Sequence, residues 1–86
     1  MSEDLRAEFE QAAIDVKGLD SRPSDDDMLK LYALYKQATD GDVSGSKPGF
    51  FDLVGRAKFE AWEELAGTSA EDAMNQYIEK VRSLGA

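Results

Sequence analysis

Apolar residues recur along this chain at helical spacing, and the pattern predicts four helices and no strand. Two stripes share steps of four, three, four and three residues: Leu5, Phe9, Ala12, Val16 and Leu19, and then Ala70, Met74, Tyr77, Val81 and Leu84. Each stripe is typical of one buried face of an amphipathic helix. We expect the first helix to weaken at Gly18 and to stop at Arg22-Pro23, because the residue before a proline avoids the α region.

The second predicted helix runs from the N-cap Ser24 to about Thr39 and stops at Gly41, with three aspartates in its first turn. A spacing of 100° per residue divides its surface into three faces. Leu31, Leu34 and Ala38 should face the core. Beside them lies a band of aromatic, aliphatic and cationic side chains: Met28, Leu29, Tyr32, Tyr35 and Lys36. The remaining face is covered by Lys30, Ala33 and Gln37.

Residues 40–49 are rich in glycine, serine and proline, which predicts a loop. The loop is long for a helix–helix connection, so the helices that it joins need not be antiparallel neighbours.

A third element starts with four apolar residues, Phe50, Phe51, Leu53 and Val54, around the plausible cap Asp52. Its stripe is Phe59, Trp62, Leu65 and Ala66, ending at Gly67; we expect Phe59 and Trp62 to be core anchors. Ser69 opens the fourth helix.

The 86 residues suffice for one small domain, residues 1–86, which we expect to be an all-α helical bundle. The chain has no cysteine and no histidine, so it lacks thiolate ligands, disulfides, and the commonest general base and metal ligand. We therefore expect neither an enzyme nor a metal or cofactor site. The absence of a long apolar run and of an apolar core at the N-terminus predicts a cytoplasmic protein without stable membrane insertion.

The formal net charge of −8 makes nucleic acid and anionic membrane surfaces unsuitable partners for the chain as a whole. The charge is unevenly distributed. Residues 1–27 carry nine acids and three bases, and residues 60–86 carry six acids and two bases, whereas residues 28–59 carry three acids and five bases. This positive middle segment is compatible with an anionic ligand, although acids near helix N-termini, as the helix dipole favours, would give a similar distribution.

Tyr32, Tyr35 and Lys36 are spaced i, i+3 and i+4, so they share one side of a helix. Two phenols beside an ammonium group suit an aromatic ring that carries phosphate. The residues alone leave a second interpretation open, in which the tyrosines are core-edge side chains with hydrated hydroxyls. Lys17 is ambiguous in the same way, because a lysine in the last turn of a helix also complements the helix dipole. Lys58 supplies a further cation from a separate helix.

Four blocks of sequence resemble the acyl-CoA-binding protein family in order and spacing. They are Tyr-x-x-Tyr-Lys-Gln-Ala-Thr-x-Gly-Asp from Tyr32 to Asp42, Lys47-Pro48-Gly49, Arg56 to Trp62, and Gly67-Thr68-Ser69 with the run from Ala73 to Tyr77. The resemblance extends from about Phe9 to Val81. It implies an up-down-down-up four-helix bundle with acyl-CoA as its ligand.

The resemblance also implies a role for individual residues. Lys36 and Lys58 would grip the ribose 3′-phosphate of the ligand, with the Tyr32 hydroxyl beside them. Tyr35 would stack on adenine, and Tyr77 would lie near the adenosine. Lys17 and Ala13 match positions along the pantetheine and phosphate path, and Met28 and Leu29 match residues of the acyl groove.

The expected function is therefore a monomeric intracellular carrier that binds medium- to long-chain acyl-CoA thioesters non-covalently, forms an acyl-CoA pool and supplies enzymes that use acyl-CoA. The alternative is a helical protein-interaction module that has kept the fold and lost the ligand. Four departures from the family bear on the preferred acyl length: Val54 in place of a common basic residue, Phe59 in place of tryptophan, the bulky pair Phe50-Phe51, and a short tail after Leu84 that lacks a basic cluster.

Overall fold

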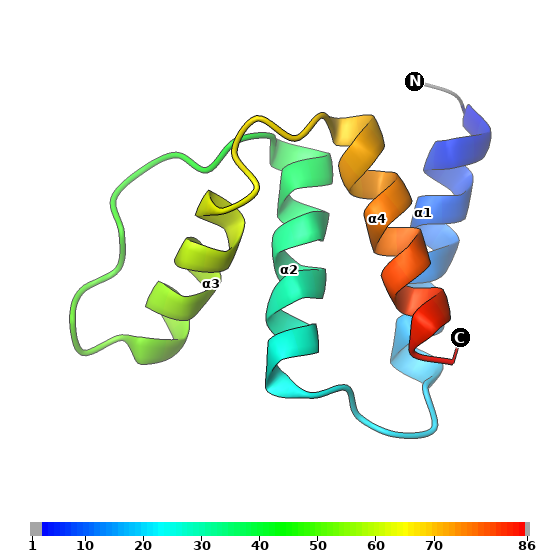
Figure 1. Cartoon of the computed structure of the whole chain (residues 1–86), viewed down its shortest axis with the longest axis horizontal. Coiled ribbons are helices and arrows are strands. Elements are labelled where there is room, and N and C mark those ends of the chain that lie inside the picture. The colour runs from blue at the N-terminus through cyan, green and yellow to red at the C-terminus, as the bar shows by residue number, and fades with distance from the viewer. Residues whose placement is uncertain (1–2, 86) are drawn as a thin grey trace.

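A computed structural model describes residues 3–85 of the chain (Figure 1). The elements are α1 (Glu3–Asp15), the 3-10 helix η1 (Val16–Gly18), α2 (Asp25–Asp40), α3 (Leu53–Glu63) and α4 (Ala70–Ser83). Within residues 3–85 there is no strand, so the predicted all-α fold is confirmed.

The helices follow the up-down-down-up topology. In Figure 1, α1 runs downwards, α2 and α3 both run upwards, and α4 runs downwards again. The long connection between α2 and α3 makes the parallel arrangement possible, because it carries the chain back from the end of α2 before α3 begins (Figure 1). Helix α2 packs against both α3 and α4, and α1 packs against α4. The molecule is flat, with principal extents of 38 × 31 × 15 Å.

Side-chain caps fix the starts of three helices, as the sequence predicted. The hydroxyl of Ser24 accepts the backbone N–H of Asp27 at 3.1 Å, and that of Ser69 accepts the N–H of Asp72 at 3.0 Å. The carboxylate of Asp52 accepts the N–H of Gly55 at 2.9 Å. Each bond satisfies one of the backbone donors that a helix start leaves without an intrahelical partner.

Two element boundaries differ from the prediction. Helix α1 ends at Asp15, and one 3-10 turn carries the chain on to Gly18 before Leu19 becomes extended. Helix α3 begins at Leu53 and ends at Glu63, so Phe50 and Phe51 precede it and residues 64–67 form turns. Gly67 closes this segment with φ +90°, a conformation that favours glycine.

The core lies between α1, α2 and α4, with one residue from the segment after α3. Its buried apolar members are Phe9, Ala12, Leu31, Ala33, Leu34, Ala38, Leu65, Ala73, Met74, Tyr77, Ile78 and Val81. Trp62 packs against this cluster as a half-buried side chain, as expected. The expectation that Phe59 is a core anchor is wrong, because its half-buried ring lies outside the core cluster. The Lys47 ammonium lies 6.0 Å from the centroid of that ring. Ala66, which was expected in the stripe of the third element, is exposed.

Two of the three residues on the remaining face of α2 are buried as deeply as the core stripe. Ala33 is 0% and Gln37 is 1% exposed. Helix α2 is covered by α3 on one side and by α4 on the other, so residues beside its core stripe are buried as well. Lys30 alone of that face is exposed.

Gln37 joins the end of α2 to the segment that follows α3. Its Nε2 donates to Asp42 Oδ1 and to the carbonyl of Thr68, both at 2.8 Å. Asp42 Oδ1 also accepts the backbone N–H of Gly67 at 2.8 Å. The N–H of Gly67 and then the amide of Gln37 lower the pKa of Asp42 below its ordinary value. These bonds hold the two loops at this end of the bundle together.

Candidate functional site

Two i, i+4 pairs interleave along the contact between α2 and α3, which we call the α2–α3 seam. Helix α2 contributes Tyr32 and Lys36, and α3 contributes Lys58 and Trp62. The Nζ atom of Lys58 lies 5.2 Å from the ring centroid of Tyr32, and the Nζ atom of Lys36 lies 5.2 Å from the ring of Trp62. Each cation therefore rests on the aromatic ring of the opposite helix, an arrangement that stabilises both. The two ammonium groups belong to one seam rather than to opposite sides of the molecule.

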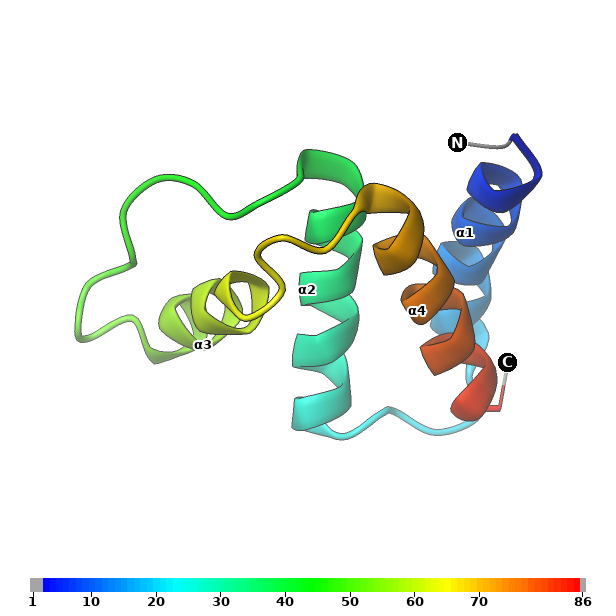
Figure 2. The same ribbon diagram turned by 45° about the horizontal axis from the view of Figure 1, so that its top comes forward.

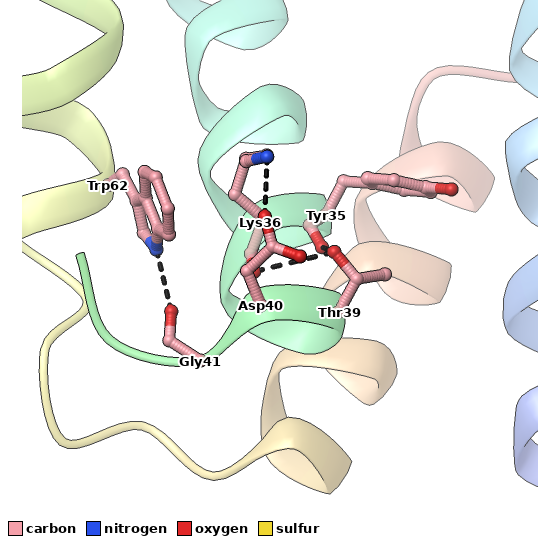
Figure 3. A network of polar contacts seen from close by, with 6 residues as sticks. All are labelled: Tyr35, Lys36, Thr39, Asp40, Gly41 and Trp62. Atoms are coloured by element: carbon pink, nitrogen blue, oxygen red, sulfur yellow. Dashed lines mark hydrogen bonds and ion pairs between the residues drawn. The ribbon is translucent and has the colours of Figure 1, made fainter. Parts of the chain in front are cut away.

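Trp62 is fixed in place by a hydrogen bond at the C-terminus of α2. Its indole Nε1 donates to the carbonyl of Gly41 at 2.8 Å (Figure 3). Gly41 has φ +84°, a value that residues with a side chain rarely adopt. The glycine that ends α2 thus also sets the position of the ring on which Lys36 lies.

Lys36 has a second partner within α2. Its Nζ forms an ion pair with the carboxylate of Asp40 at 2.5 Å, one helical turn further on (Figure 3). That carboxylate raises the pKa of Lys36, so the side chain is a permanent cation near neutral pH. Asp40 is half exposed, so an incoming anion can compete with it for Lys36.

A first apolar groove of about 540 Å³ lies where the linker between α1 and α2 meets α2 and α4. Its lining is Val16, Lys17, Leu19, Ser21, Arg22, Pro23, Met28, Leu31, Tyr32, Tyr35 and Tyr77. A second groove of about 600 Å³ lies between α2 and α3. It is lined by Arg22, Asp25, Met28, Leu29, Tyr32, Leu53, Val54, Ala57 and Lys58. Arg22, Met28 and Tyr32 line both grooves, so the two are neighbours that share these three side chains.

Three aromatic rings cluster at the first groove. Tyr35 stacks on Phe9 with a centroid separation of 5.3 Å, and Tyr77 meets both rings edge-on at 5.1 and 6.0 Å. Tyr35 remains 42% exposed, whereas Tyr77 is 5% exposed. Burial raises the pKa of Tyr77, and the neighbouring Tyr35 adds to the shift. Tyr35 thus offers an aromatic surface that Phe9 supports from the protein side.

The structure brings eight of the nine predicted site residues to the two grooves or to the seam. Tyr32, Tyr35, Tyr77, Lys17 and Met28 line the first groove, and Leu29 and Lys58 line the second. Lys36 lies on the seam. Ala13 is the exception, because it is half-buried, packs against the core and lines neither groove.

The predicted site set omits several residues that line the grooves, among them Arg22, Leu53, Val54 and Ala57. The sequence pattern indicated only that Arg22 ends the first helix. Its place in the lining of both grooves depends on how the linker between α1 and α2 packs against α2. The other three had a usable signal. Leu53, Val54 and Ala57 are spaced i, i+1 and i+4 on α3 and fall outside the stripe of Phe59 and Trp62. A second apolar face on a short helix indicates another contact surface.

Within residues 3–85, no three acidic side chains gather as a metal site would require, and the aspartates of α2 serve its first turn. Among the same residues, no helix has the length and apolarity to cross a membrane.

Known proteins resemble the chain over most of its length. The family described as Acyl CoA binding protein matches residues 6–81. An acyl-CoA-binding protein homolog of Manduca sexta is 54% identical over 81 residues, covering 93% of this chain and 90% of that protein.

Solved structures agree with this match. The crystal structure of acyl-CoA-binding protein 2 from Oryza sativa has a TM-score of 0.88 and 48% identity, covering 93% of this chain and 89% of that one. The crystal structure of ACBP from Moniliophthora perniciosa has a TM-score of 0.87 and 41% identity, covering 98% of this chain and 80% of that one. The resemblance first seen in the sequence is confirmed, and the chain belongs to the acyl-CoA-binding protein family.

Proposed function

We propose that this protein binds medium- to long-chain acyl-CoA thioesters without covalent chemistry and acts as a carrier and pool former for them. One observation carries the proposal. Lys36 and Lys58 come from separate helices to the same seam, beside Tyr32 and next to two apolar grooves. A ligand with phosphates, an aromatic base and a long apolar tail uses every one of these features.

The nucleotide end of the ligand belongs at the seam and the first groove. Lys36 and Lys58, with the Tyr32 hydroxyl, would hold the ribose 3′-phosphate, each charge-assisted hydrogen bond contributing about 1.5–3 kcal/mol. Tyr35 would stack on adenine, a contact of about 1–3 kcal/mol. Its exposed ring and its support by Phe9 favour that role. Tyr77 would close the adenosine side of the groove.

The remaining assignments follow the path of the ligand. Lys17 would contact the phosphate and pantetheine portion from the rim of the first groove. Met28 and Leu29 would contact the acyl chain, and burial of that chain is worth about 0.8 kcal/mol per CH₂. Met28 lines both grooves, which supports a continuous path from nucleotide to tail. Ala13 is retained on the family resemblance alone, because it lies outside both grooves.

We further propose binding without turnover, in the cytoplasm, by a monomer that meets acyl-CoA-using enzymes only transiently. The chain has no histidine or cysteine to activate a thioester, which supports a carrier. The net charge of −8 disfavours nucleic acid as a partner.

Isothermal titration calorimetry with palmitoyl-CoA, free CoA and palmitate tests the proposal. The expected order of affinity is palmitoyl-CoA far above CoA, with palmitate weakest, because only the first ligand uses both the cations and the grooves. Equal and weak binding of all three would refute a carrier and favour a protein-interaction role. Release of free CoA from palmitoyl-CoA during incubation would refute binding without turnover.

A further inference from the structure

The chain has three methionines and no cysteine, so thioethers are its only sulfur groups. Met1 lies outside the described residues, and the other two methionines have opposite environments. Met28 on α2 is 41% exposed, whereas Met74 on α4 is 1% exposed and belongs to the core cluster. Oxidation of a thioether requires that the oxidant reach it, so an exposed methionine reacts before one that packed side chains enclose. The two methionines should therefore differ in reactivity.

Met28 lies where the two grooves meet. It lines both the first groove, of about 540 Å³, and the second groove, of about 600 Å³. Of the three side chains that both grooves share, it is the aliphatic one, the others being Arg22 and Tyr32. Figures 1 and 2 both show the start of α2 at an edge of the fold, where the linker from α1 enters. An oxidant in solution therefore reaches Met28 through the mouth of either groove.

The fold around Met28 does not depend on its side chain. Its backbone N–H donates to the carbonyl of Ser24 at 2.9 Å, within a helix start that the Ser24 hydroxyl caps. The side chain belongs neither to the buried core nor to the half-buried residues packed against it. A polar group added to Met28 changes the lining of the grooves and leaves the core intact. The same group added to Met74 would lie in the core without a partner.

Oxidation converts the Met28 thioether to a sulfoxide, which is polar. The step is a two-electron oxidation by a peroxide. The O–O bond breaks, one oxygen atom bonds to the sulfur, and the other leaves as water when the oxidant is hydrogen peroxide. An acyl chain laid against the sulfoxide would remove water from its oxygen and offer no hydrogen-bond donor in return, so oxidation penalises the bound tail.

We propose that Met28 is an oxidation site through which peroxides lower the affinity of this protein for long-chain acyl-CoA. The inference rests on the proposed function, because it takes the acyl chain to lie against Met28. The thioether joins the apolar linings of the two grooves, whereas the sulfoxide interrupts them. Reduction by a methionine sulfoxide reductase restores the thioether. Binding and oxidation oppose each other, since a bound acyl chain covers the side chain that the oxidant must reach.

Peptide mass spectrometry of the folded wild-type chain during treatment with hydrogen peroxide tests the accessibility of the site. Sulfoxide should form at Met28 at least tenfold faster than at Met74. Saturating palmitoyl-CoA should slow the reaction at Met28 severalfold and leave the rate at Met74 unchanged. Equal rates at the two methionines would overturn the proposal. A rate at Met28 that does not respond to bound palmitoyl-CoA would do the same.

Isothermal titration calorimetry before and after oxidation tests the effect on binding. The affinity of the wild type for palmitoyl-CoA should fall at least tenfold, which corresponds to about 1.4 kcal/mol, and methionine sulfoxide reductase should restore it. Met28→Leu is the matched control, because leucine is also aliphatic and has no sulfur to oxidise. Each protein is compared with its own untreated sample, so the starting affinity of the variant does not enter. Peroxide should not change the affinity of Met28→Leu, although this variant retains Met1 and Met74.

Circular dichroism melting of the same samples shows whether the oxidised chain is folded. An equal loss of affinity in the wild type and in Met28→Leu would overturn the proposal, as would the loss of the melting transition in the oxidised wild type. If complete oxidation of Met28 leaves the affinity unchanged, this inference fails and the carrier function stands. If the untreated wild type does not bind palmitoyl-CoA, the carrier function is refuted and the inference fails with it.

Discussion

The ammonium group of Lys58, on α3, lies 5.2 Å from the ring centroid of Tyr32, on α2. A positive charge from α3 is therefore held against α2. Tyr32 is one helical turn before Lys36, whose own ammonium rests on Trp62 of α3. The two cations are thus positioned by the same contact between helices. The proposed phosphate site lies between these two cations.

The first prediction tests this shared phosphate site. Lys36→Ala and Lys58→Ala should each weaken palmitoyl-CoA binding by roughly tenfold or more, since each removes a charge-assisted bond of about 1.5–3 kcal/mol. Neither change should weaken binding of 3′-dephospho-palmitoyl-CoA to the same extent, because that ligand lacks the group that the lysines hold. Calorimetry with both ligands measures the difference.

Lys30→Ala is the control, because Lys30 is an exposed lysine of the same helix that lines neither groove. If Lys36→Ala and Lys58→Ala keep the wild-type ratio of affinities for palmitoyl-CoA and 3′-dephospho-palmitoyl-CoA, the assignment of the 3′-phosphate to this seam is wrong.

The second prediction concerns Asp40, the carboxylate that pairs with Lys36. Asp40→Asn should raise affinity for palmitoyl-CoA about two- to fivefold, in the range of an exposed ion pair of about 0.2–1 kcal/mol. In the Lys36→Ala background the same change should have a smaller effect, and the double-mutant cycle gives the coupling. An equal gain in both backgrounds would mean that Asp40 acts through the general field of the protein and does not compete for Lys36.

Local geometry explains which parts of this site the sequence could predict. Tyr32 and Lys36 are neighbours on any helix that contains both, so their spacing alone places them together. The caps Ser24, Asp52 and Ser69 were equally readable, because each acts within its own turn.

Long-range packing explains what could not be predicted. Gln37 is a polar residue that the helical pattern places beside the core stripe, and it is buried because residues from the segment after α3 return to meet it. Arg22 lines both grooves only because the linker after η1 folds against α2. The early end of α3 depends on the turn at residues 64–67, whose last glycine bonds to Asp42.

The third prediction tests the role of Gln37 as a link between loops. Gln37→Leu removes two donated bonds of 2.8 Å and leaves the Thr68 carbonyl without this donor. We expect a loss of about 2 kcal/mol in the free energy of unfolding, or roughly 8–16 °C in Tm for a domain of this size. Thermal melting by circular dichroism measures it. Gln11→Leu alters an exposed glutamine on α1 and should change Tm little; equal losses in both variants would contradict a specific role for Gln37.

The fourth prediction is a pH dependence that originates at Asp27. Lys80 of α4 contacts its carboxylate at 2.6 Å, and this hydrogen bond lowers the pKa of Asp27 below its ordinary value. A carboxylate with a lowered folded-state pKa stabilises the protein above its unfolded-state pKa, and this stabilisation is lost as the pH falls towards the folded-state value. The wild type should therefore exceed Asp27→Asn in stability at pH 7, and the difference should shrink below about pH 4.

Urea denaturation at several pH values between 2.5 and 7 measures this difference. Asp26→Asn is the control, since Asp26 is an exposed residue of the same helix turn for which the structure gives no ion pair with α4. A difference between the wild type and Asp27→Asn that stays constant across the range would show that the carboxylate charge contributes nothing.

The fifth prediction assigns the second groove to the acyl chain through Ala57, a residue that sequence reasoning did not select. Ala57 lines that groove on α3, across from Leu29 on α2, and its small side chain leaves space between the helices. Ala57→Leu should fill this space and weaken palmitoyl-CoA by tenfold or more, since each excluded CH₂ costs about 0.8 kcal/mol. Hexanoyl-CoA, whose tail is too short to use the full groove, should lose affinity by threefold at most.

Ala66→Leu places the same added volume at an exposed position outside both grooves and should leave both affinities unchanged. Equal losses for the two chain lengths would place the end of the tail elsewhere, because a blocked groove must penalise the longer chain more.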